Sequence, residues 1–230
     1  MGRVLNHTID RNDWTRAHWR TFCVAALLCL VLPGASAETI KKSFPTSATP
    51  SFLIHNHTGK VAITGWDQNE ITVQSQAASD AMDVIIMGTE QKVSVQVHPK
   101  RERLSAQEAR LDFQIQVPRQ ATVRVDSERG EIVVENLEGN LTIEGVSTAV
   151  SLAKLKGHIS VRTVDGPIQI RSSDGLIKAD SISGDLRFVQ VNGSELIGTT
   201  NTGSIRYEGD FGDGGTDCRR EWDGRTGCSR

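Results

Sequence analysis

The fold is decided by three consecutive nine-residue stretches that each begin with glycine: Gly157-His-Ile-Ser-Val-Arg-Thr-Val-Asp, Gly166-Pro-Ile-Gln-Ile-Arg-Ser-Ser-Asp and Gly175-Leu-Ile-Lys-Ala-Asp-Ser-Ile-Ser. The same spacing continues in both directions, and only Thr148 occupies a grid position without glycine. We expect turn glycines at Gly130, Gly139, Gly157, Gly166, Gly175, Gly184, Gly193 and, after a ten-residue step, Gly203. Self-similarity at a fixed period is typical of a solenoid, in which each unit buries its apolar face against its neighbours.

Apolar residues follow the grid glycines at the second and fourth positions, which point to one side of an extended chain. These pairs are Ile132/Val134, Leu141/Ile143, Val150/Leu152, Ile159/Val161, Ile168/Ile170, Ile177/Ala179 and Leu186/Phe188. A third apolar residue recurs at the seventh position, with Ser173 as the exception: Leu137, Val146, Leu155, Val164, Ile182 and Val191. The intervening residues are mostly polar, so we expect three inward residues per unit and a polar exterior.

Nine residues fit one short strand and a turn, so two units would make a flattened coil of about 18 residues. The predicted fold class is all-β, a single β-solenoid with two short strands per coil. Units 18 residues apart would then stack Ile132, Val150, Ile168 and Leu186 in one ladder, and Leu141, Ile159 and Ile177 in another. An antiparallel sandwich of short hairpins remains the alternative, because its turns are also spaced by 8–12 residues.

The rest of the chain divides around this repeat. Residues 38–51 are rich in Ser, Thr and Pro and are expected to form a linker. The solenoid domain is expected at 52–207, with the regular repeats at 130–207 and a slipped register or bulge near 194–201. Less regular strands are expected within 52–126, at 52–56, 60–64, 70–76, 92–98, 111–117 and 121–126, with a buried strand at 82–87 and a loop or short helix at 99–110. A Gly/Asp/Arg-rich tail follows at 208–230.

Residues 1–37 have the features of a secretory signal peptide. Basic residues precede the apolar run Phe22–Leu32, and Ala35-Ser36-Ala37 fits the cleavage rule, so cleavage is expected between Ala37 and Glu38. The apolar run is shorter than the roughly 20 residues that a transmembrane helix needs, and no second long apolar segment follows. An uncleaved amphipathic N-terminus is the alternative. The chain is therefore expected to be extracytoplasmic: periplasmic, on the cell surface or secreted.

Charge and cysteine content limit the partners of the mature chain. Without the leader the chain carries 22 Lys/Arg and 26 Asp/Glu, a net charge of −4, which gives no electrostatic footprint for nucleic acid. Only Cys218 and Cys228 remain after cleavage, and an even number in an exported protein predicts a Cys218–Cys228 disulfide. Two free thiols in the tail are the alternative.

No residue set spells out a reaction, so no catalytic, cofactor-binding or metal-binding residue is assigned. His55-x-His57 could present two imidazoles to one ion, but a stable site needs three or four ligands. The aspartates that precede Gly166 and Gly175 are too few for a calcium-binding β-roll. Outward acids such as Asp185 are scattered, and the aromatic residues form no stripe for stacking sugars.

The chain resembles the bacterial "putative adhesin" domain of unknown function, a family of exported β-solenoid proteins. The resemblance rests on Phe52-Leu-Ile-His-Asn-His-Thr-Gly-Lys-Val-Ala-Ile-Thr-Gly-Trp-Asp67, on Phe113-Gln-Ile-Gln-Val-Pro118, and on the glycine units from Gly130 to Tyr207. It implies a surface-associated or envelope-stress protein without catalytic residues to transfer. The cysteine-containing tail and the scarcity of Asn-Gly corners, present at Asn192-Gly193 and nearly at Asn201-Thr-Gly203, depart from the family pattern.

The sequence thus predicts a non-enzymatic scaffold or adhesin-like interaction module of the cell envelope or surface, which binds an envelope protein or surface ligand. Two alternatives remain open: a carbohydrate-active enzyme on a parallel β-helix, and a ligand-sensing partner of a membrane signalling protein. An outward triad of acids or bases aligned across neighbouring coils would favour the enzyme, whereas a flat polar face would favour the scaffold.

Overall fold

The computed structural model describes residues 39–209, 217–220 and 225–229. They belong to one compact unit, Ser36–Arg230, and the predicted signal peptide and its cleavage site lie outside the described residues. The described residues form sixteen strands and no helix, so none of them offers a helix that could span a membrane. The strands are β1 Thr39–Pro45, β2 Ser51–Trp66, β3 Glu70–Ala77, β4 Met82–Gly88, β5 Lys92–Pro99, β6 Leu111–Pro118, β7 Thr122–Glu135, β8 Leu141–Ala153, β9 Lys156–Asp165, β10 Ile168–Arg171, β11 Asp174–Ser181, β12 Leu186–Val189, β13 Asn192–Thr200, β14 Ile205–Glu208, β15 Asp217–Arg220 and β16 Arg225–Ser229.

The strands from β7 to β14 pair in parallel with partners about 18 residues away in the sequence. Ile168 lies between Val150 of β8 and Leu186 of β12, and Ile159 lies between Leu141 of β8 and Ile177 of β11. Both predicted ladders are therefore confirmed. The hairpin alternative is wrong for this region, because hairpins would have given antiparallel neighbours.

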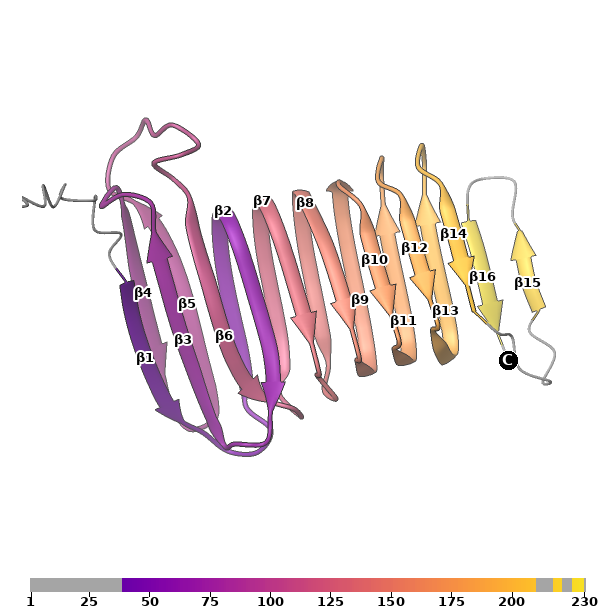
Figure 1. Cartoon of the computed structure of the whole chain (residues 1–230), viewed down its shortest axis with the longest axis horizontal. Helices are drawn as coiled ribbons and strands as arrows, with labels where there is room; N and C mark the ends of the chain where they lie inside the picture. Colours follow the sequence, from indigo (N-terminus) through magenta and orange to yellow (C-terminus); the bar gives the residue numbers. More distant parts are fainter. Residues whose placement is uncertain (1–38, 210–216, 221–224, 230) are drawn as a thin grey trace, which may run out of the picture. The chain divides into compact units, whose positions relative to one another are not determined.

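The long strands β2, β7 and β8 each contribute to two rows of strands. The first half of β2 pairs with β5 and its second half pairs with β6. On its other side, β2 pairs with β7 along most of the length of β2. One row continues through β9, β11 and β13, and the other through β10, β12 and β14. Figure 1 shows the two rows as two layers of strands, one in front of the other.

The core lies between these rows and consists of the residues at the second and fourth positions of the units. Every predicted pair from Ile132/Val134 to Leu186/Phe188 is buried. The seventh-position prediction is wrong at every second corner: Leu137, Leu155 and Val191 are buried, but Val146, Val164 and Ile182 are 50%, 45% and 52% exposed.

Two kinds of corner explain this difference. At the second corner of each 18-residue stretch, the backbone adopts the left-handed conformation at Asn136, Lys154, Ser172 and Gln190, and the residue after each is buried. At the first corner (residues 127–131, 145–149, 163–167 and 181–185), the inward side chains are small and polar: Ser127, Thr148, Thr163 and Ser181 are buried. Thr163 and Ser181 share a hydroxyl hydrogen bond of 3.1 Å, and the Gly184 N–H donates to Ser181 Oγ. Side chains that follow these buried hydroxyls point outward, as strand alternation requires.

The turn glycines are needed mainly because the backbone of the neighbouring parallel strand approaches closely. Gly166 has a φ of 124°, which glycine adopts readily, and a Cβ there would clash with the carbonyl of Thr148. Gly184 and Gly193 lack a positive φ, yet a Cβ would clash with the carbonyls of Gly166 and Gly175. Of the eight expected turn glycines, Gly130, Gly157, Gly166 and Gly175 have a positive φ.

The expected linker is wrong for residues 39–45, which form β1 and pair antiparallel with β3. Ile40 and Phe44 pack against the core, so alternation outweighs the Ser/Thr/Pro composition. The expected buried strand at 82–87 is β4, which pairs only with β5 within the described residues and exposes Ile85 and Met87. Residues 99–110 contain turns rather than a helix.

The predicted register slip is confirmed after Gly193. One extra residue on β13 shifts the pairing, so Leu196, rather than Glu195, lies opposite Ile177. The regular pattern then returns, with Ile205 opposite Leu186 and Tyr207 opposite Phe188. At the C-terminal end, β16 pairs antiparallel with β13.

Candidate interaction groove

A groove of about 310 Å³ lies where one row of strands meets the first corner, and we call it the first-corner groove. It crosses β2, β7, β8 and β9. Its lining residues are His55, Asp126, Ser127, Glu128, Glu144, Gly145, Val146, Arg162 and Val164. These side chains come from four adjacent strands, so the groove depends on coil stacking rather than on one segment of sequence.

One wall is a charged row of residues that occupy equivalent outward positions on neighbouring strands. The register places His55 beside Asp126, Asp126 beside Glu144, Glu144 beside Arg162, and Arg162 beside Asp180. Because adjacent strands lie about 4.8 Å apart, the row brings several ionisable side chains close together.

Arg124, one outward position before Asp126 on β7, ties two carboxylates of this row together. Its guanidinium lies 3.3 Å from Asp126 and 3.1 Å from Glu144. Arg162 makes no ion pair with any residue that the structure describes, so its guanidinium is available to a ligand.

The opposite wall is formed by Val146 and Val164. Together with Ile182 on the next strand of the row, they make an apolar stripe. All three are at least 45% exposed and lie on successive coils at the first corner. Their backbones are held in register, because Ser183 N donates to the Val164 carbonyl and Ile182 N donates to the Thr163 carbonyl. A row of exposed branched side chains is costly in water, and contiguous exposed apolar side chains mark binding surfaces.

Small residues lie between the two walls. A Cβ at Gly145 would meet Thr148 and Thr163, so the missing side chain leaves space inside the corner. Ser127 occupies the equivalent position on β7 and is only 5% exposed. Its buried hydroxyl has no hydrogen-bond partner among the described residues and lies on the inward side of the strand, as Thr163 and Ser181 do.

The two candidate metal-ligating histidines lie at one end of the groove. The rings of His55 and His57 meet edge to face with centroids 5.4 Å apart, and His57 Nδ1 lies 3.0 Å from Glu128 Oε1. Among the described residues, no group of three or more His, Cys, Asp or Glu side chains has an arrangement that could hold a metal ion, and the contact between His57 and Glu128 does not make one.

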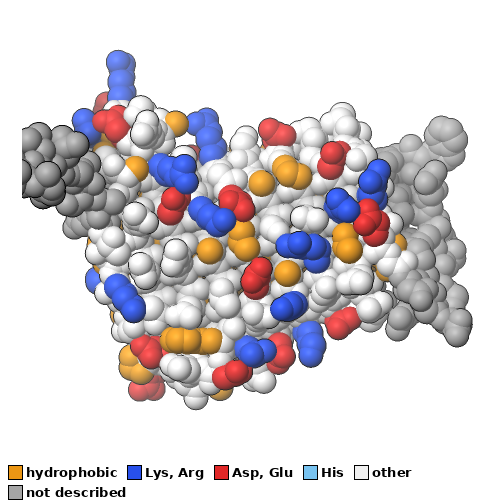
Figure 2. All heavy atoms as spheres, viewed as in Figure 1, with side chains coloured by type: hydrophobic (Ala, Val, Ile, Leu, Met, Phe, Trp, Pro, Cys, Tyr) orange, Lys and Arg blue, Asp and Glu red, His pale blue; other side chains and the backbone are white. Residues whose placement is uncertain are grey.

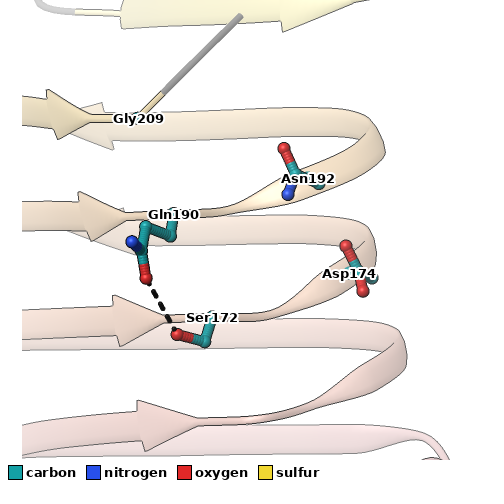
Figure 3. A pocket seen from close by; sticks show the side chains of 5 residues that line it. All are labelled: Ser172, Asp174, Gln190, Asn192 and Gly209. Atoms are coloured by element: carbon teal, nitrogen blue, oxygen red, sulfur yellow. Dashed lines mark hydrogen bonds between the residues drawn. The ribbon is translucent and has the colours of Figure 1, made fainter. Parts of the chain in front are cut away.

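A second hollow, of about 500 Å³, lies along the second corner (Figure 3). Ser172 and Gln190 stand on neighbouring coils, and their side chains are joined by a 3.4 Å hydrogen bond. Asp174 and Asn192 are also on neighbouring coils, next to the turn. These polar groups are exposed and partly paired with each other, so they give this hollow a weaker binding signature than the first-corner groove.

A largely polar face lies on the second row of strands. Its hollow of about 360 Å³ is lined mainly by amides and hydroxyls, together with Lys41, Ala62 and Ile115. Cross-strand pairs such as Gln74 with Gln114 and Thr72 with Gln116 are in register. Basic and acidic side chains are interspersed on the face shown in Figure 2. The fold therefore carries a feature expected of each alternative. The aligned row of ionisable groups was expected of an enzyme, and the polar face was expected of a scaffold.

Apart from the two histidines, the residues singled out from the sequence lie outside the first-corner groove. Asp185 is exposed and accepts hydrogen bonds from the backbone N–H and hydroxyl of Ser204, and the backbone N–H bond is the larger cause that lowers the pKa of Asp185. Arg187 pairs with Glu208 on β14. Phe188 is buried, and the Tyr207 hydroxyl donates to the Val191 carbonyl, so neither presents a ring for stacking sugars.

The backbone of β15 and β16 places Cys218 directly opposite Cys228, as a bridge between them requires. The disulfide itself stays a prediction. Sequence reasoning missed the first-corner groove, although the outward positions 126, 144, 162 and 180 are all charged at an 18-residue spacing, which could have revealed the charged row.

The chain was compared with known proteins. No protein-family model matches it, and no curated protein matches its sequence. Among solved structures, it is similar to a crystal structure described as a putative cell adhesion protein from Clostridium sporogenes ATCC 15579, with a TM-score of 0.44 and 10% identity over 76% of this chain and 100% of that chain. This likeness is too distant to transfer a function.

Proposed function

We propose that this chain is an exported, non-enzymatic interaction module of the cell envelope or surface. In this proposal it is a β-solenoid with two strands per coil, and it binds its partner through the first-corner groove. The parallel register at an 18-residue offset, with two alternating kinds of corner, supports the solenoid. The basic stretch of the leader, its apolar run Phe22–Leu32 and the Ala35-Ser36-Ala37 site support export.

The observation that carries the binding role is the apolar stripe beside the charged row. Three exposed branched side chains in register gain nothing for the stability of the fold, because they point away from the core. A partner that covers them removes apolar surface from water, at roughly 25 cal/mol per Å². The adhesin-like role implied by the family resemblance fits such a surface and is part of the proposal.

Site-specific photo-crosslinking in intact cells tests the binding role. A crosslinking amino acid at Val164 would lie in the groove, and one at Gln169 would lie on the other row of strands as a matched control. We expect partner adducts from position 164 and none from position 169. Equal adducts at both positions, or none at position 164, would contradict the proposal. N-terminal sequencing of the exported protein is expected to begin at Glu38.

The charged row favours one second candidate, a carbohydrate-active enzyme. Glycoside hydrolysis uses a pair of carboxylates flanking the scissile bond, and Asp126 and Glu144 stand on adjacent strands. Because Arg124 contacts both carboxylates, we expect them to hold charge balance rather than to transfer protons. Turnover of a polysaccharide panel that Glu144→Gln abolishes would establish the enzyme instead.

A further inference from the structure

We propose that the first-corner groove binds an extended polypeptide segment of a partner protein in which basic side chains alternate with apolar ones. This inference rests on the proposed binding role of the groove. It adds the chemical class of the partner, which follows from the shape of the groove, its walls and its charge.

The shape fits an extended chain. The groove crosses four strands, and the apolar stripe continues to Ile182 on the next coil. Four steps of about 4.8 Å give a length of roughly 19 Å, which an extended segment of about six residues spans. A folded domain would need a broader apolar surface than one row of side chains offers.

The walls select the side chains of that segment. Successive side chains of an extended chain point to opposite sides, so alternate residues can face the two walls. Residues on one side would cover Val146 and Val164, and residues on the other would face the charged row. This arrangement requires a sequence in which apolar and polar residues alternate.

Charge complementarity selects basic side chains for the polar side. The groove is lined by three carboxylates, Asp126, Glu128 and Glu144, and by one guanidinium, Arg162. Counting Arg124, which lies behind the row, carboxylates still outnumber guanidinium groups by three to two. A segment with Lys or Arg is therefore attracted, whereas an acidic segment or an anionic lipid surface is repelled.

The walls favour a polypeptide over a glycan. They combine the aliphatic side chains of Val146 and Val164 with a row of ionisable groups, and the one aromatic ring among the lining residues is the imidazole of His55. Sugars stack on the larger rings of Trp, Tyr and Phe, none of which lines the groove.

Fluorescence anisotropy with the mature chain tests this partner class. The probes are labelled peptides of about eight residues in which Lys alternates with Val, Glu alternates with Val, or Lys alternates with Ser. We expect the Lys–Val peptide to bind more tightly than the other two, and added salt to weaken its binding. Comparable binding of the Glu–Val or the Lys–Ser peptide would overturn the proposal.

Variants locate the binding on the groove. Val164→Ser is expected to lower the affinity for the Lys–Val peptide by about tenfold. The variant lacks the valine side chain whose apolar surface binding would remove from water. Val164→Ile should retain the affinity, Glu144→Gln should lower it and reduce its salt dependence, and Gln169→Ser should leave it unchanged. Thermal melts verify that the variants are folded. An unchanged affinity for Val164→Ser would refute the assignment.

Two further probes separate the partner class from the binding role. Binding of anionic vesicles or of a soluble polysaccharide that the Lys–Val peptide does not displace would overturn the peptide proposal. If position 164 crosslinks to a partner in cells while no Lys–Val peptide binds, the partner class is wrong and the binding role stands. If neither crosslinking nor peptide binding occurs, both are wrong.

Discussion

Ile168 tests how strongly the stacked coils depend on their inward ladder. Its side chain is 1% exposed and lies between Val150 and Leu186 on the neighbouring coils. Replacing isoleucine by alanine removes three carbon atoms at about 0.8 kcal/mol each, or about 2.5 kcal/mol of transfer free energy. The cavity left between two fixed neighbours adds to this loss, so Ile168→Ala is expected to lower the free energy of unfolding by about 3–4 kcal/mol.

Two matched controls separate burial from position in the sequence. Gln169→Ala changes the next residue, whose side chain points out of the same strand, and is expected to change stability by less than about 0.5 kcal/mol. Val164→Ala removes carbon atoms from an apolar side chain that is 45% exposed, and is expected to cost less than about 1 kcal/mol. Ile168→Asp would place an unpaired charge in the core and is expected to unfold the domain.

Urea denaturation followed by far-UV circular dichroism measures these differences. A common m-value would show that the variants unfold in the same cooperative step, so that shifts in midpoint report stability. A smaller m-value for Ile168→Ala would indicate that coils on either side of the cavity unfold separately. Similar losses for Ile168→Ala and Gln169→Ala would refute the assignment of inward and outward faces.

Three further predictions concern the corners and the tail. Lys154 has a φ of 55°, which costs a side chain about 1 kcal/mol or more, so Lys154→Gly is expected to raise the melting temperature; Lys156→Gly, at a strand position without a positive φ, should lower it. Asp185 has a pKa below its ordinary value of 3.8, so its hydrogen bonds stabilise the fold above that pH and are lost as the pH falls through the lowered pKa. The stability difference between wild type and Asp185→Asn, measured across acid pH, should therefore shrink below about pH 4, and a constant difference would contradict the stated cause. Cys218 and Cys228 are expected to form a disulfide, and intact mass after alkylation without reduction should show no modified thiol.

The strand ladders could be predicted from the sequence because glycine spacing and strand alternation are local rules with fixed geometry. A nine-residue grid fixes which residues lie 18 apart, and parallel stacking then brings Ile168 to Val150 and Leu186. Even the extra residue after Gly193 could be recognised, since it breaks a pattern that is otherwise regular.

The two corners could not be told apart in this way. Val164 and Leu155 occupy equivalent positions in the nine-residue grid, yet one is exposed and the other is buried. The difference depends on whether the corner is turned by a left-handed residue, as at Lys154, or by buried hydroxyls, as at Thr163. Composition likewise failed at Thr39–Pro45, where an available sheet edge turns a Ser/Thr/Pro-rich segment into a strand.

The sequence by itself therefore determined the all-β class, the 18-residue register and the inward residues of each strand, because these follow from periodicity along the chain. Only the tertiary structure decided where the first-corner groove lies, since it brings His55 of β2 beside Asp126 and places this charged row next to the exposed side chains of the corner. Stacking places these residues about 4.8 Å apart from strand to strand. No local sequence pattern predicts which outward row lies beside a corner whose apolar side chains are exposed to water.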